Sequence, residues 1–144
     1  MAAFRFRLQG YLNLKEKLEE QSELAYGKAL AHLYREQEAR RILEAERQAK
    51  LCKFREDIAK KVQPQVIRGY NNYIELLKRR IAERDKSIEK AKIAAEKRRL
   101  ELVEAMKQRK IIEKLRERKR EEFLQQENIN EQKVLDEVIS YRFN

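Results

Sequence analysis

The sequence predicts an all-α protein: two long helices forming an antiparallel coiled-coil hairpin. Ala, Glu, Lys, Arg and Leu supply 87 of the 144 residues, a composition typical of long helices and coiled coils. Three Gly, one Pro and no Trp are too few turn-forming residues for a sandwich, a barrel or a doubly wound sheet. Charged residues match apolar ones at 42% each, so a broad two-layer core would have to bury charge. We therefore do not expect a globular α/β enzyme.

One stretch of the chain can hold a reversal, the segment KKVQPQVIRGYNN that begins at Lys60. Pro64 cannot continue a helix from its interior, but its fixed φ suits the first turn of a new one. The lysines at 60 and 61 carry the charge that favours a helix C-terminus. We expect a first helix over about residues 4–61, a turn over about 62–66 and a second helix over about 66–139, in a single domain of residues 1–144.

The second segment carries a clear heptad repeat. Apolar residues recur at alternating steps of four and three, which is the spacing of a coiled-coil seam. The predicted seam is Ile67, Tyr70, Ile74, Leu77, Ile81, Arg84, Ile88, Ala91, Ala95, Arg98, Leu102 and Ala105. Because the second helix is the longer one, we expect its carboxyl end to overhang the first helix or to pair only at the end.

The first segment has a looser stripe with several small residues. Its predicted members are Phe4, Leu8, Tyr11, Leu18, Ala25, Ala29, Ala39, Leu43, Phe54 and Ile58. Glutamates four residues before a cation predict ion pairs within each helix, worth only ~0.2–0.5 kcal/mol apiece. These pairs are Glu36–Arg40, Glu46–Lys50 and Glu75–Arg79.

The residues that could carry out chemistry lack partners. His32 is the only histidine and Cys52 the only cysteine, so no metal cluster, disulfide or nucleophile–base pair can be assembled. The glycines form no phosphate-binding loop. No apolar run has the length of a signal peptide or a membrane span. We predict a cytosolic protein that is not an enzyme and holds no metal or cofactor.

The net charge of +10 calls for an acidic partner. From Lys90 to Arg120 there are 13 basic residues and 5 glutamates, a net charge of +8. The segment has no aromatic residue for base stacking, and its acidic residues are interleaved. An acidic protein surface is therefore favoured over nucleic acid, a solvated face alone stays open, and membrane binding is a minor contribution.

Apolar and aromatic residues are concentrated just after the predicted turn. There are more of them than a single coiled-coil seam can bury. They are Tyr70, Tyr73, Ile74, Leu76, Leu77 and Ile81. They could close the hairpin as a hydrophobic plug, or they could form a docking patch where aromatic residues and arginine suit a protein interface. Both interpretations stay open.

Three stretches carry a resemblance that covers nearly the whole chain. They are the opening FRFRLQGYLNLKEKLEEQ, then GYNNYIELLKRRIAERD after the turn, and KIIEKLRERKREEFLQQENINEQKVLDEVISYRF at the end. In this order they resemble the FliJ family of flagellar type III export. The resemblance implies a hairpin similar to the central stalk (γ) subunit of rotary ATPases. It also implies binding to the hexameric export ATPase FliI, whose assembly and ATP hydrolysis it would promote, and to the export gate protein FlhA. The implied location is the cytoplasmic face of the cell membrane at the flagellar base, with only peripheral membrane contact.

The resemblance also implies two binding faces. The gate-binding face falls on Tyr73, Leu77, Arg80 and Arg84; the two arginines stand where the family has a smaller residue and a histidine. The ATPase-binding face falls on the paired termini. Its members are Phe4, Arg5, Phe6, Arg7 and Leu8, together with Leu135, Val138, Tyr141, Arg142 and Phe143.

Three alternatives remain at this stage. The chain could be an escort that returns empty export chaperones to the ATPase complex, because an exposed helical surface would serve equally well. It could be a basic coiled coil that binds nucleic acid, with an affinity that falls steeply with salt. It could also dimerise through the unpaired part of the second helix.

Overall fold

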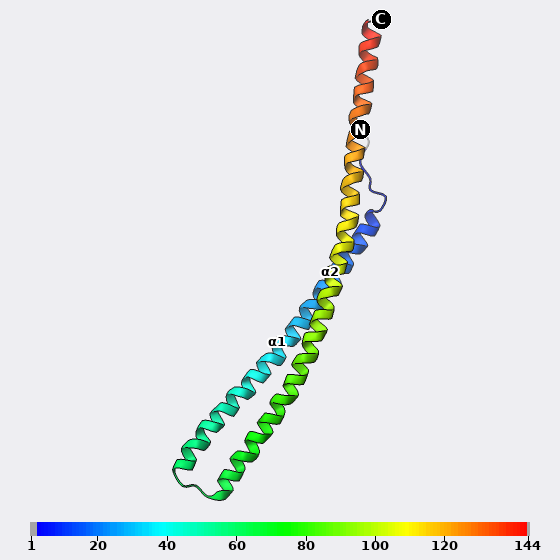
Figure 1. Cartoon of the computed structure of the whole chain (residues 1–144). Helices are drawn as coiled ribbons and strands as arrows, with labels where there is room; N and C mark the ends of the chain where they lie inside the picture. The colour runs from blue at the N-terminus through cyan, green and yellow to red at the C-terminus, as the bar shows by residue number, and fades with distance from the viewer. Residues whose placement is uncertain (1–2, 144) are drawn as a thin grey trace. The chain divides into compact units, whose positions relative to one another are not determined.

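The computed structural model describes residues 3–143, so residues 1, 2 and 144 of the predicted domain lie outside the described part. Two helices account for almost all of it: α1, Gln9–Ala59, and α2, Pro64–Phe143. They are joined by residues 60–63 and run antiparallel (Figure 1). The described residues contain no strand. The predicted all-α hairpin is therefore confirmed.

The helix α1 begins at Gln9, five residues later than the predicted start near residue 4. Phe4 and Phe6 are half-buried while Arg5 and Arg7 are exposed, an alternation typical of extended chain. The Phe4 ring packs on Phe123 of α2, with 5.6 Å between the ring centres. We attribute the late start to this packing, which requires the segment to leave the helical path.

The turn is closed by backbone hydrogen bonds and one residue of unusual conformation. The N–H of Lys60 donates to Asp57 (3.1 Å) and that of Lys61 to Ile58 (3.3 Å). Lys61 has a φ of 53°, the left-handed conformation that often ends a helix and that glycine adopts most easily. Pro64 is the first residue of α2, so this helix begins two residues before its predicted start; it ends at Phe143 rather than near 139.

The contacts divide the chain into two compact units, each holding a piece of both helices. The turn-containing unit is Glu23–Glu101. The terminal unit comprises, in its described part, residues 3–22 and 102–143. The sequence had indicated one continuous coiled coil.

In the turn-containing unit, the core lies on the predicted seam of α2. All six buried residues of this helix belong to that seam, and Leu77 is completely buried. They are Ile74, Leu77, Ile81, Ile88, Ala91 and Ala95. Arg84 and Arg98, the two basic interruptions, are exposed.

The seam of α1 differs from the predicted stripe because it is partly charged. Leu8, Tyr11, Leu18 and Ile58 of that stripe are exposed, between 38% and 47%. In the turn-containing unit, a regular heptad of half-buried residues runs along α1 instead: Tyr26, Ala29, Leu33, Glu36, Arg40, Leu43, Arg47, Lys50, Phe54 and Asp57. Long polar side chains can bury their stems and keep their heads in water, so half of this seam is polar.

The terminal unit is held by one buried leucine, the packing of Phe4 on Phe123 and a few polar contacts. Leu12 is 2% exposed. Lys15 donates to Gln108 (2.7 Å), and Arg109 pairs with both Glu19 of α1 and Glu113 of α2. Beyond Phe123, every described residue of α2 except Glu127 is exposed. The longer helix therefore overhangs its partner, as predicted.

Candidate protein-binding surfaces

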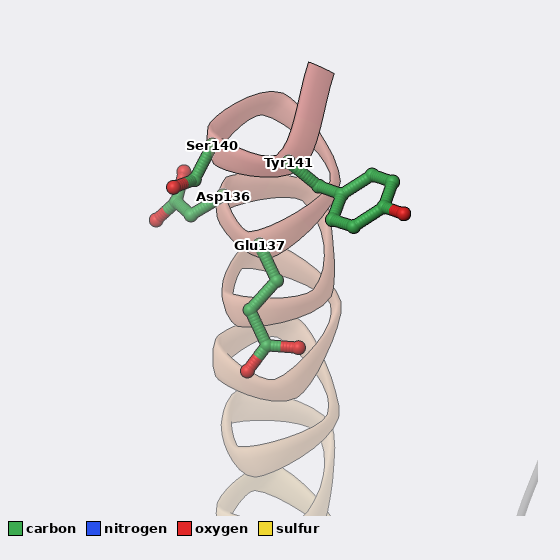
Figure 2. Close-up of a pocket in the computed structure, with 4 residues that line it drawn as sticks. All are labelled: Asp136, Glu137, Ser140 and Tyr141. Carbon is green, nitrogen blue, oxygen red and sulfur yellow. The ribbon is translucent and has the colours of Figure 1, made fainter. Parts of the chain in front are cut away.

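The depression drawn in Figure 2 is formed by Asp136, Glu137, Ser140 and Tyr141, which all project from a single stretch of α2. No second element closes this surface, so it cannot exclude water from a substrate. Within the described part of the chain, no three potential ligands are grouped to hold a metal ion. His32 and Cys52 are both exposed on α1.

Neither α1 nor α2, over its described residues, contains a stretch long and apolar enough to cross a membrane.

Tyr73, the first predicted gate-binding residue, is tied into the hairpin. Its hydroxyl donates a hydrogen bond to Glu46 of α1, and the Nζ of Lys50 lies 5.2 Å from its ring centre. The hydrogen bond to Glu46 raises the pKa of the Tyr73 hydroxyl; partial burial and the charge of Glu46 raise it further, while Arg80 lowers it. Tyr73 is therefore half-buried and presents only part of its ring.

Leu77 cannot be a surface contact, because its side chain is completely buried between the helices. Leu77 belongs both to the implied binding face and to the heptad seam, and in the structure it is part of the core. Truncation of Leu77 to alanine would open a cavity between the helices rather than remove a surface contact.

Arg80 and Arg84 are exposed and line a shallow groove between the two helices. Arg84 donates to Glu36 of α1 over 2.9 Å, an interhelical pair instead of the predicted Glu36–Arg40 pair. Ile42 of α1 also lines the groove and is 54% exposed, which the sequence analysis missed. The remaining lining residues are Ala39, Leu43, Glu83 and Ser87.

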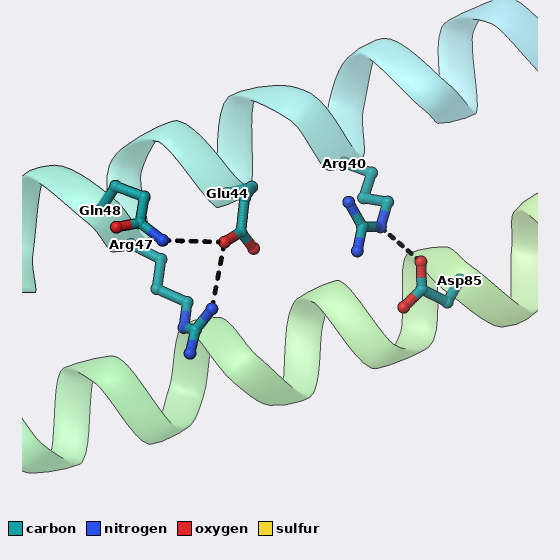
Figure 3. A network of polar contacts seen from close by, with 5 residues as sticks. All are labelled: Arg40, Glu44, Arg47, Gln48 and Asp85. Carbon is teal, nitrogen blue, oxygen red and sulfur yellow. Dashed lines mark hydrogen bonds and ion pairs between the residues drawn. The ribbon is translucent and has the colours of Figure 1, made fainter.

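Polar contacts in the same unit lie at a second depression, which Arg40, Glu44 and Arg47 line (Figure 3). Arg40 pairs with Asp85 of α2 at 2.5 Å, and Glu44 accepts hydrogen bonds from Arg47 (3.1 Å) and from Gln48 (3.2 Å). Arg47 Nε is buried and has no hydrogen-bond partner among the described residues. Of the three predicted ion pairs within a helix, none forms in the described residues: Glu36 bonds to Arg84, Glu46 to Tyr73 and Glu75 to Lys78.

The predicted ATPase-binding residues fall in two separate places. Residues 4–8 line a groove against Leu115, Lys119 and Phe123 of α2. Leu135, the nearest of the C-terminal group, lies twelve residues beyond Phe123, about 18 Å along the helix. The two termini are thus not paired with each other, because α2 extends beyond the part that residues 4–8 contact. The C-terminal aromatic residues are the most exposed large apolar side chains, with Tyr141 at 89% and Phe143 at 85%.

Comparison with known proteins gives two matches. The family model described as "Flagellar FliJ protein" matches residues 4–144. The solved structure of CT670 from Chlamydia trachomatis, described as a YscO homolog, is 24% identical. It superposes with a TM-score of 0.54 over 94% of this chain and 93% of that one, a likeness of fold. A search of the curated proteins found no significant match.

Proposed function

The chain belongs to the FliJ family of flagellar export components, and from that membership we propose that it is a stalk-like partner of the export ATPase FliI and a link to the export gate protein FlhA. Members of this family are non-catalytic parts of the export apparatus. The proposal places the protein at the cytoplasmic face of the membrane at the flagellar base. FliI would bind the terminal unit and FlhA the turn-containing unit.

One observation carries the ATPase assignment: residues 124–143 of α2 are exposed apart from Glu127, yet they include large apolar side chains. These are Leu124, Ile129, Val134, Leu135, Val138, Ile139, Tyr141 and Phe143. Helices in proteins gain most of their stability from packing, so contact with a partner would stabilise this exposed stretch.

The proposed effect on ATP hydrolysis follows from the difference in symmetry between the hairpin and the hexameric ring of FliI. A two-helix coil cannot present the same surface to every subunit of a ring of identical subunits. Its contacts are therefore unequal and favour different conformations in different subunits. The free energy comes from ATP binding and hydrolysis in the ring, and the coil contributes only differential binding.

The test is the steady-state ATPase rate and hexamer content of FliI with the full chain and with a chain that ends at Phe123. We expect the full chain to raise both, and the shortened chain to lose most of the effect. Tyr34→Ser, which changes an exposed aromatic residue of the other unit, is the matched control and should behave as wild type. Equal stimulation by the shortened chain would overturn the assignment of residues 124–143.

The gate assignment rests on Tyr73, Arg80 and Arg84. The two arginines line the groove beside an exposed isoleucine, and aromatic residues and arginine are enriched at the centres of interfaces. We expect Tyr73→Ala and the pair Arg80→Ala with Arg84→Ala to weaken FlhA binding. The control pair is Arg79→Ala with Lys86→Ala, two exposed cations of α2 outside the groove. Unchanged FlhA affinity in folded variants of the first set would refute the assignment.

A further inference from the structure

The basic segment has no role in the function above, and the structure separates its cations into two groups. Residues 102–120 of the terminal unit contain eight Lys or Arg and three Glu, a net charge of +5. Arg109 and Lys119 are in ion pairs. The other six make no hydrogen bond or ion pair to any described residue: Lys107, Lys110, Lys114, Arg116, Arg118 and Arg120.

Four of these six cations share one face of α2. Lys107, Lys110, Lys114 and Arg118 fall within an arc of about 80° on a helical wheel. We call them the cationic stripe. The half-buried residues Ala105, Ile112 and Phe123 lie on the opposite side of the helix, toward the rest of the hairpin. The cationic stripe therefore faces away from the hairpin.

The next part of the same helix has the opposite charge. Residues 121–143 contain six Asp or Glu and two Lys or Arg, a net charge of −4, and they carry the exposed apolar residues named above. The two parts cannot meet within one chain, because α2 is continuous from Pro64 to Phe143. Lys114 and Glu131, for example, are about 26 Å apart along it.

The heptad of the cationic stripe continues into this acidic part. Steps of seven residues lead from Lys107 through Lys114, Glu121 and Asn128 to Leu135. A second set, offset by three residues, runs through Lys110, Glu117, Leu124, Glu131 and Val138. Two sets at this offset are the a and d positions of a coiled coil. One outward face of α2 is thus basic at its start, and acidic and apolar toward its end.

We propose that this face binds the same face of a second copy, with the two α2 helices antiparallel. The antiparallel register that sets Lys114 against Glu131 also sets Lys110 against Leu135 and Lys107 against Val138. The dimer therefore contains the Lys114–Glu131 pair twice, once at each end of the contact. Shifting by one heptad in either direction brings two glutamates together, Glu117 with Glu121 or Glu121 with Glu131. Like charges in contact are unfavourable, so charge selects the first register.

The contact would be isologous, since each copy contributes both a basic and an acidic part. Each cationic stripe meets the acidic part of the other copy. The lysine stems can cover Leu135 and Val138 while their ammonium groups stay in water. Because the hairpin seam lies on the other side of α2, the dimer leaves the fold of each copy intact. This inference does not depend on the proposed function.

Sedimentation equilibrium of the protein alone tests it. At low salt we expect a reversible dimer with twice the 17.5 kDa mass of the chain, dissociating as salt screens the exposed pairs. Lys114→Glu should raise the dissociation constant about tenfold or more, because both Lys114–Glu131 pairs of the dimer become repulsions. Glu131→Lys should do the same. Arg116→Glu, an equal charge change on the other side of the helix, should leave it unchanged.

The mixed sample is decisive. Lys114→Glu and Glu131→Lys each repel a second copy of themselves, but the two variants complement each other, so an equimolar mixture should form a heterodimer with near wild-type affinity. A wild-type chain that stays monomeric at low salt would overturn the proposal. So would a mixture that stays monomeric, or a control variant that dissociates as readily as the stripe variant. These measurements contain no FliI or FlhA, so they test the dimer alone, although Leu135 and Val138 also belong to the segment assigned to FliI.

Discussion

The hydroxyl of Tyr73 on α2 donates a hydrogen bond to the carboxylate of Glu46 on α1, so an aromatic residue predicted to face a partner is also part of the hairpin. Tyr70 makes the same kind of contact with Asp57, at 2.5 Å. Both tyrosines therefore couple the two helices near the turn, and this coupling has a measurable pH dependence.

Stability should fall at high pH through these two tyrosines. The hydrogen bond to a carboxylate raises the pKa of each hydroxyl above its ordinary value, first by Asp57 for Tyr70 and by Glu46 for Tyr73. The folded state then holds the proton more tightly than the unfolded state. The contribution is present below the unfolded pKa of about 10 and is lost as pH rises through the folded pKa.

Chemical denaturation at pH 8 and at a series of values above 10 measures this effect. Tyr70→Phe with Tyr73→Phe should flatten the decline relative to wild type, since other titrating groups are common to both proteins. An identical decline in both would show that neither hydroxyl is coupled to folding.

Leu77→Ala should destabilise the hairpin by about 3 kcal/mol, because it removes buried methyl groups and leaves a cavity. Leu76→Ala is the matched control. Leu76 is 36% exposed, against 0% for Leu77, so its truncation should cost less than about 1 kcal/mol. Urea unfolding followed by circular dichroism gives both values. Equal costs would mean that Leu77 is not the centre of the core.

Lys61→Gly should stabilise the protein by about 1 kcal/mol. Lys61 has a φ of 53°, where the Cβ of any residue other than glycine is strained. Lys60→Gly, at a neighbouring position without a positive φ, should not stabilise and serves as the control. Thermal unfolding of the two variants distinguishes them; stabilisation by both would point to loss of charge rather than relief of strain.

Arg109 and Glu19 should show a favourable coupling of about 1 kcal/mol or less in a double-mutant cycle with Arg109→Gln and Glu19→Gln. Their side chains are only 20% and 18% exposed, so the pair is less screened than those on the open surface. The pair Arg41–Glu38, with side chains 67% and 55% exposed, is the control and should couple more weakly. Urea unfolding at low salt gives both cycles, and equal coupling would show that burial adds nothing to the terminal pair.

The seam of α2 was predictable because its residues obey one local rule. Ile74, Leu77 and Ala91 recur at heptad spacing, and a helix turns that spacing directly into a buried face. The place of the turn was predictable for a similar reason, since Pro64 acts on its own backbone and needs no distant partner.

The seam of α1 and the start of that helix were not predictable in this way. Arg40 can lie on the seam because its guanidinium forms an ion pair with Asp85 of the other helix. Phe4 leaves the helical path because its ring packs against Phe123. The alternation of apolar and basic residues in FRFR indicated an extended segment. Four residues are too short a pattern, however, to outweigh a composition that favours helix over the whole chain. Each of these outcomes depends on a partner more than forty residues away.

The sequence by itself determined that this protein is a two-helix hairpin, where it reverses, and to which family its order of motifs belongs. Only the tertiary structure decided which residues of a periodic stripe are core and which are surface. It buried Leu77, left Arg80 and Arg84 exposed, and set Tyr141 and Phe143 beyond the reach of the first segment. The physical reason is that periodicity is a property of one helix, whereas burial depends on where the other helix lies and where it ends.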